Sequence, residues 1–194
     1  DFKSDEGKLA LYVILGSIAT AVFGFLFRDL FESFFNNLWA VGAAFIITGT
    51  FYSFLMIFDN RRKENRPLNH FDAVLIGVAQ GIALIPGVSR SGVTITTGLL
   101  RKVDKQSAFA FSFLLFIPAV LGATILTAAE AQNLATANVD TAAVFFGLAI
   151  TVIVGYFSLR LLRNIVLKGR FHLFAFYCWA IGFIVLLTQV LGTF

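Results

Sequence analysis

Long stretches without a single charged residue are the feature that most limits what this chain can fold into. Five of them match the roughly 20 residues that an α-helix needs to cross about 30 Å of hydrocarbon. Lipid offers no partner to an open backbone N–H or C=O group, so such stretches must be helical. We therefore predict an all-α integral membrane protein with about five transmembrane helices, at Leu9–Phe27, Leu38–Phe58, Ser107–Ala129, Thr141–Leu159 and Leu173–Phe194.

The composition agrees with a bilayer protein and argues against other classes. Hydrophobic residues make up 58% of the 194 residues and charged residues 13%, whereas soluble domains usually carry about 25% charge. The net charge of +4 does not indicate nucleic-acid binding, because the charges lie in short loops and form no basic face. The single cysteine, Cys178, provides no disulfide framework and is expected to pack among apolar groups.

A sixth apolar stretch, Ala73–Leu100, is too long for one ordinary span, and the string PGVSRSG breaks it in the middle. Pro86 and Gly87 stop a helix, and Ser89 or Ser91 can cap a new one. The prediction is therefore two half-helices that meet at a polar tip, at about Ala73–Ile85 and about Ser91–Leu100.

The distribution of Lys and Arg indicates that this broken segment turns back rather than crosses the membrane. If it is re-entrant, 13 of the 15 Lys and Arg residues lie on one side and one lies on the other. If it crosses, they divide six against eight. The positive-inside rule favours the first arrangement. We expect the hairpin to enter from the cytoplasm, with the N-terminal end of the chain cytoplasmic and its C-terminus outside.

Three smaller features were weighed alongside the spans. The segment Arg28–Asn37 has apolar residues at helical spacing, so an interfacial helix and a plain loop with apolar anchors both fit it. Pro118 is expected to kink its helix. Neither His70 nor His172 has another ligand residue at metal-binding spacing, so no metal site is expected in this chain.

Arg90 is the one basic residue that this topology leaves inside the membrane. A charged side chain there costs about 2.5–3.5 kcal/mol on insertion scales, so it normally faces a cavity and a counter-ion. Its own segment contains one acidic residue, Asp72, at the edge. The partner of Arg90 is therefore either a carboxylate on a distant helix, which makes the residue structural, or an anionic ligand.

The surroundings of Arg90 favour the anionic ligand. Serine and threonine hydroxyls flank it, and two glycines allow close approach of the backbone. A helix that begins nearby points free amides and its positive dipole end into the break, and a guanidinium matches phosphate oxygens. The sequence thus predicts a phosphate cradle within the membrane. The candidates for catalysis are Arg90, Ser89 and Ser91, and those for substrate binding are Gly87, Gly92, Thr94 and Gln80.

Two motifs carry a resemblance to a known family. The first consists of Gln80–Gly81, Ala83–Leu84 and the string PGVSRSGVTI of residues 86–95, and the second is FSFLLFIP of residues 111–118. Together they resemble the second signature, and the helix after it, of undecaprenyl-diphosphate phosphatases of the bacitracin-resistance type. The pattern of spans extends this resemblance over essentially the whole chain.

The resemblance implies hydrolysis of undecaprenyl diphosphate to undecaprenyl phosphate and phosphate, which recycles the carrier of peptidoglycan synthesis and confers bacitracin resistance. It implies inverted repeats with two re-entrant hairpins in the bacterial cytoplasmic membrane, and an active site open to the outer face. By this resemblance Arg90 binds and stabilises the diphosphate. The alternative is a transporter or flippase of a phosphorylated polyprenyl lipid, because broken helices that point at an anion also occur in transporters. A membrane subunit without chemistry is a further alternative.

The family's first signature, a glutamate-rich stretch with a Pro-x-Ser-Ser-x-Gly-His string, is not found in these 194 residues, which begin without Met. We expect residues 1–194 to be a single membrane domain, the C-terminal part of a longer enzyme, and to be inactive alone. The other part would supply the base or nucleophile and the ligands of a divalent cation, Mg²⁺ or Ca²⁺. The expected partners are a polyprenyl diphosphate and membrane lipids, with no nucleic acid, and a homodimer is left open.

Overall fold

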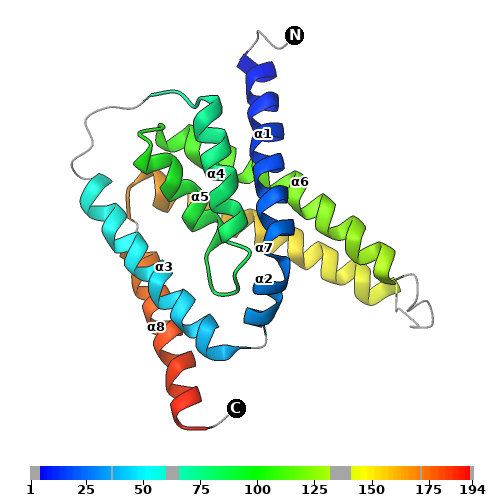
Figure 1. Ribbon diagram of the computed structural model, residues 1–194, viewed down its shortest axis with the longest axis vertical. Coiled ribbons are helices and arrows are strands. Elements are labelled where there is room, and N and C mark those ends of the chain that lie inside the picture. Colours follow the sequence, from blue (N-terminus) through cyan, green and yellow to red (C-terminus); the bar gives the residue numbers. More distant parts are fainter. Residues whose placement is uncertain (1–4, 36, 60–65, 132–140, 171, 193–194) are drawn as a thin grey trace.

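The computed structural model describes residues 5–35, 37–59, 66–131, 141–170 and 172–192, and these ranges are almost entirely helical (Figure 1). The prediction of an all-α protein is therefore confirmed. The described helices are α1 (Asp5–Leu26), α2 (Arg28–Phe35), α3 (Leu38–Asp59), α4 (His70–Ile82), α5 (Arg90–Leu100), α6 (Lys105–Ala131), α7 (Thr141–Leu167) and α8 (His172–Val190).

Four of the described helices, α1, α6, α7 and α8, are long and apolar enough to cross a membrane on their own. The count rises to five if α2 and α3 are taken together as one bent span. The α6 helix continues through Pro118 as a single element. These helices confirm the prediction of a multi-pass membrane protein.

The end of α7 differs from its prediction. We placed the end at Leu159, before the first arginine, but the helix runs eight residues further to Leu167. Charge does not end a helix, and long arginine side chains can reach the interface from its last turns. Gly169 ends α7 instead, with a φ of +67°. The amides of Gly169 and Arg170 bond back to the carbonyls of Val166 and Ile165, as in a Schellman motif.

The segment after α1 is helical, which excludes the plain loop, while an interfacial position stays a prediction. Backbone hydrogen bonds from Phe27 to Phe23 and from Phe31 to Phe27 carry the helical ladder from α1 into α2. The rings of these three residues stack along the junction, with centroids 4.6 to 6.5 Å apart. Phe31 is buried. The α2 helix therefore extends α1 (Figure 1).

The broken segment turns back on itself, as predicted. Asp72, in the first turn of α4, accepts a hydrogen bond of 3.0 Å from Arg101, the residue directly after α5. An isolated parallel bridge joins Arg66, just before α4, to Val103, just after α5. Both ends of the hairpin therefore lie at the same end of the molecule, while residues 83–89 form its tip between the other helices (Figure 1).

The hairpin reaches deep into the helix bundle. The α4 helix packs along α1, so that Gly77 lies against Gly16 and Leu84 lies near Gly24 in the last turn of α1. At the tip, Gly87 approaches the carbonyl oxygen of Val41, in the first turn of α3. The tip therefore lies close to the helix ends opposite the hairpin's own base. Arg90, the first residue of α5, lies about 15 Å from Leu100 at the base end of the helix, given a rise of about 1.5 Å per residue.

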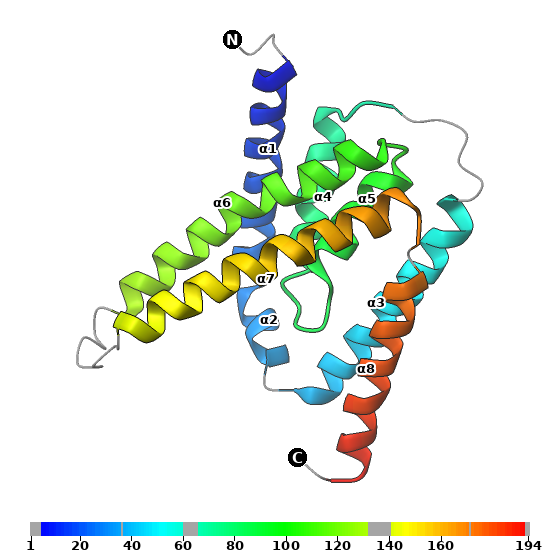
Figure 2. The same cartoon turned by 180° about the vertical axis from the view of Figure 1, so that it is seen from behind.

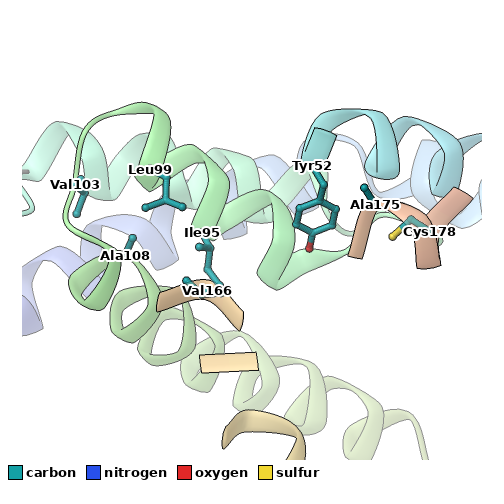
Figure 3. Packing of buried hydrophobic residues seen from close by; sticks show 8 residues of the cluster. All are labelled: Tyr52, Ile95, Leu99, Val103, Ala108, Val166, Ala175 and Cys178. Atoms are coloured by element: carbon teal, nitrogen blue, oxygen red, sulfur yellow. The ribbon is translucent and has the colours of Figure 1, made fainter. Parts of the chain in front are cut away.

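Two buried clusters hold the hairpin from both sides. In one, Ala73 and Ile76 of α4 pack against Phe111 and Leu115 of α6. The other joins α5 to α3, α6, α7 and α8 (Figure 3). Cys178 is buried in this second cluster, as expected from the sequence. The members of the second cluster are Tyr52, Ile95, Leu99, Val103, Ala108, Val166, Ala175 and Cys178.

The α3 and α8 helices form a close pair of their own, visible from both sides of the molecule (Figures 1 and 2). Gly49 of α3 leaves room for the indole of Trp179, whose Nε1 donates a 3.3 Å hydrogen bond to Thr50. Gly182 of α8 lies against the carbonyl oxygen of Gly42. This pairing fixes the face of α3 that carries Tyr52 toward the hairpin.

The α7 helix and the distal half of α6 project from the rest of the molecule (Figure 2). Their side chains are large, apolar and exposed, as for Phe145 at 71% and Ile125 at 69%. In a membrane such surfaces meet acyl chains, so their exposure is compatible with a stable fold.

Gly77→Ala tests the contact between α1 and α4. The new methyl group would overlap the carbonyl oxygen of Gly16, so the two helices must move apart. We expect overpacking to lower stability by about 1–3 kcal/mol, measured by thermal unfolding in detergent micelles. Gly122→Ala is the matched control, because nothing lies within 4 Å of the added group. An equal loss of stability in both variants would contradict the packing described here.

Candidate anion site at the hairpin tip

Ser89 begins α5 and organises the tip around it. Its side chain accepts a hydrogen bond of 3.3 Å from the backbone amide of Gly92, which makes it the N-cap residue that the sequence suggested. The hydroxyl of Tyr52 on α3 lies 3.2 Å from the same Ser89 oxygen. The first backbone amides of α5 thus face the tip, and Ser89 caps one of them. The positive end of the helix dipole also lies at the tip.

Gly87 and Gly92 are required by contacts with α3. Gly87 has a φ of +90°, and a Cβ there would lie 2.6 Å from the carbonyl oxygen of Val41. A Cβ at Gly92 would overlap the hydroxyl of Tyr52. The Thr48 hydroxyl also lies 3.5 Å from the Gly87 carbonyl oxygen. The close approach predicted for these glycines is therefore made by α3, and their role toward a ligand stays a prediction.

Arg90 occupies the first position of α5 and is partly buried. Its guanidinium carbon lies 3.2 Å from the centroid of the Phe116 ring on α6. Its Nη1 atom is buried and has no hydrogen-bond partner in the part of the chain that the structure describes. None of the described carboxylates forms a salt bridge with it. Within these ranges the guanidinium keeps its positive charge and at least one N–H group available.

Thr94 ties the first turn of α5 to α6. Its hydroxyl lies 2.8 Å from the Arg90 carbonyl oxygen and 2.5 Å from the hydroxyl of Ser112. Thr94 and Ser112 are both fully buried. Ser91 is different, because the residue is partly exposed and its hydrogen bond with Thr94 uses the backbone carbonyl rather than the side chain. Of the predicted serines and threonines, Ser91 is therefore free to meet a ligand, while Thr94 is engaged in helix packing.

Gln80 lies between α4, α1 and α6. Its side-chain amide donates to Leu115 at 3.2 Å and to Thr20 at 3.4 Å. Its Oε1 atom is buried and has no donor among the described residues. The structure thus places Gln80 in the packing beneath the tip, and its predicted contact with substrate stays a prediction.

The base of the hairpin is held by a buried carboxylate, which the sequence did not single out. Asp72 is fully buried, and its two oxygens accept hydrogen bonds of 2.6 and 2.8 Å from Arg66 and one from Arg101. Asp72 and Asn69 also cap each other's backbone amides at the start of α4. Burial by itself raises the pKa of Asp72, but hydrogen bonds from Arg66 and Arg101 outweigh it and lower the pKa below 3.8. Asp72 is therefore an anion engaged with its own arginines, so it does not neutralise Arg90.

A small apolar pocket lies on another face of α5. Its lining includes Tyr52 of α3, Thr96 of α5, Leu162 of α7 and Phe174 of α8. The Thr96 hydroxyl is buried without a hydrogen-bond partner in the described ranges. An apolar lining suits a hydrocarbon group better than an anion.

Metal ligands are not gathered anywhere in the part of the chain that the structure describes. No three His, Cys, Asp or Glu residues in these ranges lie close enough together to hold an ion. His70 and His172 are each the first residue of a helix and are exposed. Glu64 and Asp140 lie outside the described residues. The described residues thus contain no cluster of metal ligands beside the tip.

A family model described as bacitracin resistance protein BacA matches residues 1–184 of the chain. The chain belongs to this BacA family. The match includes α1 to α7, with the whole hairpin, and α8 as far as residue 184. It also confirms the family membership expected from PGVSRSGVTI and FSFLLFIP.

Curated BacA relatives carry the name undecaprenyl-diphosphatase. The relative from Alkaliphilus metalliredigens is 35% identical over 95% of this chain and 67% of its own length. The one from Carboxydothermus hydrogenoformans is 37% identical over 99% of this chain and 74% of its own. A relative from Methanothermobacter thermautotrophicus is 35% identical over 90% of this chain and 97% of its own length. The chain thus spans 67% to 97% of the length of these three relatives.

The hydrogen bonds from Arg66 and Arg101 to Asp72 should make the stability of this BacA protein depend on pH. Because its folded-state pKa is lowered, Asp72 contributes stability that is fully present above the unfolded pKa of about 4. That contribution is lost as the pH falls through the lower folded-state pKa. We expect Asp72→Asn to lower the unfolding temperature at pH 5–8. At lower pH, the unfolding temperature of the variant should fall less than that of the wild type. Both temperatures are measured by tryptophan fluorescence.

Glu32→Gln is the matched control for Asp72→Asn. It also removes a carboxylate that pairs with an arginine, but the Arg28–Glu32 pair is about 60% exposed on both sides. Exposed pairs contribute about 0–1 kcal/mol, so this variant should unfold at nearly the wild-type temperature. If Asp72→Asn behaves like the control across the pH range, the carboxylate does not hold the base of the hairpin.

Proposed function

We propose that this BacA protein hydrolyses undecaprenyl diphosphate to undecaprenyl phosphate and phosphate. The observation that carries the proposal is Arg90, a partly buried guanidinium with an unpartnered N–H group at the start of a re-entrant helix. A charge in this position is costly without a partner. A lipid-linked diphosphate is an anion that arrives within the membrane and can supply that partner.

The tip offers three kinds of group suited to a diphosphate. Arg90 presents a planar set of N–H donors that can bind two phosphate oxygens at once. The first amides of α5, with the positive end of its dipole, add further attraction for negative charge. The partly exposed Ser91 hydroxyl adds a neutral donor. Because phosphoryl transfer depends mainly on positioning and charge neutralisation, these groups would stabilise the transition state as well as the substrate.

The depth of the hairpin supports an active site that opens away from the hairpin's base. Gly87 lies beside the first turn of α3, and Leu84 lies beside the last turn of α1. If the basic residues at the base are cytoplasmic, the tip approaches the outer face of the membrane. We propose that the site receives its lipid from that face of the bacterial cytoplasmic membrane.

The names of the relatives supply the lipid in this proposal. Proteins 33–42% identical to this chain are called undecaprenyl-diphosphatase. By extension, the protein would return the lipid carrier to peptidoglycan synthesis and contribute to bacitracin resistance. A polyprenyl chain also suits a protein whose helices expose wide apolar surfaces to the membrane.

The described residues do not provide every group that hydrolysis needs. Asp72 is the one fully buried carboxylate that they contain, and two arginines at the hairpin base occupy it. We therefore propose that the general base or nucleophile, and any ligands of a Mg²⁺ or Ca²⁺ ion, come from outside the described residues. Arg90, Ser91 and the amides of α5 bind and orient the diphosphate.

Arg90→Lys tests the proposal with the charge retained. Lysine keeps a positive charge but lacks the planar fork, so we expect phosphate release from undecaprenyl diphosphate to fall about 10²–10³-fold, as when one transition-state donor is removed. Release is measured in membranes that contain the protein as its gene encodes it. Arg163→Ala, on the exposed part of α7, is the control and should keep wild-type activity.

Two outcomes would contradict the proposal. Unchanged phosphate release in Arg90→Lys would show that Arg90 is structural. Passage of the intact lipid diphosphate across vesicles, with no phosphate released by the wild-type protein, would indicate a transporter.

A further inference from the structure

We propose that Phe116 is a positioning residue that orients the Arg90 guanidinium for a diphosphate. The inference rests on the proposed function, because it concerns the same anion site. Phe116 lies on α6, outside the PGVSRSG string, and its side chain is 39% exposed. By exposure alone it would count among the many lipid-facing phenylalanines of this chain, but its ring contacts a cation.

The distance between the two groups determines their orientation. The guanidinium carbon lies 3.2 Å from the ring centroid, which is van der Waals contact. At that separation a guanidinium standing on edge would push one nitrogen into the ring. The guanidinium must therefore lie nearly flat on Phe116, in the stacked geometry that arginine adopts on aromatic faces.

Flat stacking on the ring does not occupy the N–H donors of Arg90. The ring occupies one face of the guanidinium, whereas the N–H donors point outward in its plane. Nη1 is one of these donors, and it is buried without a partner among the described residues. Phe116 thus attracts the cation without consuming a hydrogen bond. A carboxylate in the same place would compete with the phosphate for those donors.

The α6 helix holds both ends of the Arg90 residue. One turn before Phe116, Ser112 contacts Thr94, whose hydroxyl lies 2.8 Å from the Arg90 carbonyl oxygen. Phe116 then contacts the far end of the same residue. Because residues four apart share a helix face, one face of α6 fixes the backbone and the side chain of Arg90 together. The donors are therefore oriented before the ligand arrives.

The test measures binding of farnesyl diphosphate, a short lipid diphosphate, to the purified protein in detergent by thermophoresis. Phe116→Leu removes the ring face, and we expect the Kd to rise about tenfold, which is the upper range of a cation–π contribution. Phe116→Tyr keeps the ring face, so its Kd should stay within about twofold of wild type. Phe109→Leu is the matched control, because Phe109 is an α6 phenylalanine whose ring contacts Phe113.

A double variant separates positioning from general packing. A lysine has no plane to orient. In the Arg90→Lys background, Phe116→Leu should therefore change the Kd for farnesyl diphosphate by less than twofold. If Phe116 were merely structural, Phe116→Leu would raise the Kd by the same factor in the wild-type and Arg90→Lys proteins. It would also lower the unfolding temperature.

Each possible result has one interpretation. If wild type binds and Phe116→Leu binds equally well, or if Tyr fails to restore binding, the positioning role is wrong. If the wild-type protein does not bind farnesyl diphosphate at all, the proposed anion site itself is wrong.

Discussion

A partly buried guanidinium without a described counter-ion, at the tip of a re-entrant hairpin, is the constraint on which the rest of this structure depends. Two neutral contacts hold Arg90: the Phe116 ring stacks on its guanidinium, and the Thr94 hydroxyl, paired with Ser112, contacts its backbone carbonyl. Its position at the start of α5 adds the positive end of the helix dipole to its own charge. None of these neutralises the charge. The protein therefore keeps a site whose electrostatic energy improves when an anion enters it.

Different kinds of contact hold the base and the tip of the hairpin. At the base, Asp72 and two arginines fix where the hairpin begins and ends. At the tip, contacts are made through small or neutral groups, such as Gly87 against Val41 and Ser89 against Tyr52. Charged residues are thus paired where they serve the fold. Arg90, a partly buried cation without an ion pair among the described residues, lies where a ligand is expected.

Sequence patterns predicted the spans and the hairpin because these follow from local physics. Uncharged runs of membrane length, a Pro86–Gly87 break and Ser89 as a cap each act within a few residues of chain. The end of α7 was wrong because we treated Arg160 as a boundary, whereas Gly169 ends the helix. The role of Phe116 could not be found this way, since Arg90 lies 26 residues away along the chain. The same holds for the contact of Asp72 with Arg101, 29 residues away, although Arg66 and Asn69 are close in sequence. A lone Phe in an FSFLLF run is indistinguishable from one that faces lipid.

The arrangement of α3 and α8 as a separate close pair has a mechanical consequence. The hairpin, α1 and α6 form one packed unit, and α3 with α8 forms a second. The Tyr52–Ser89 hydroxyl pair, the contacts of Gly87 and Gly92 with α3, and the second buried cluster all join the two units. The stack of Phe116 on Arg90 lies within the first unit alone. The orientation of the cation and the attachment of the α3–α8 pair therefore depend on different contacts.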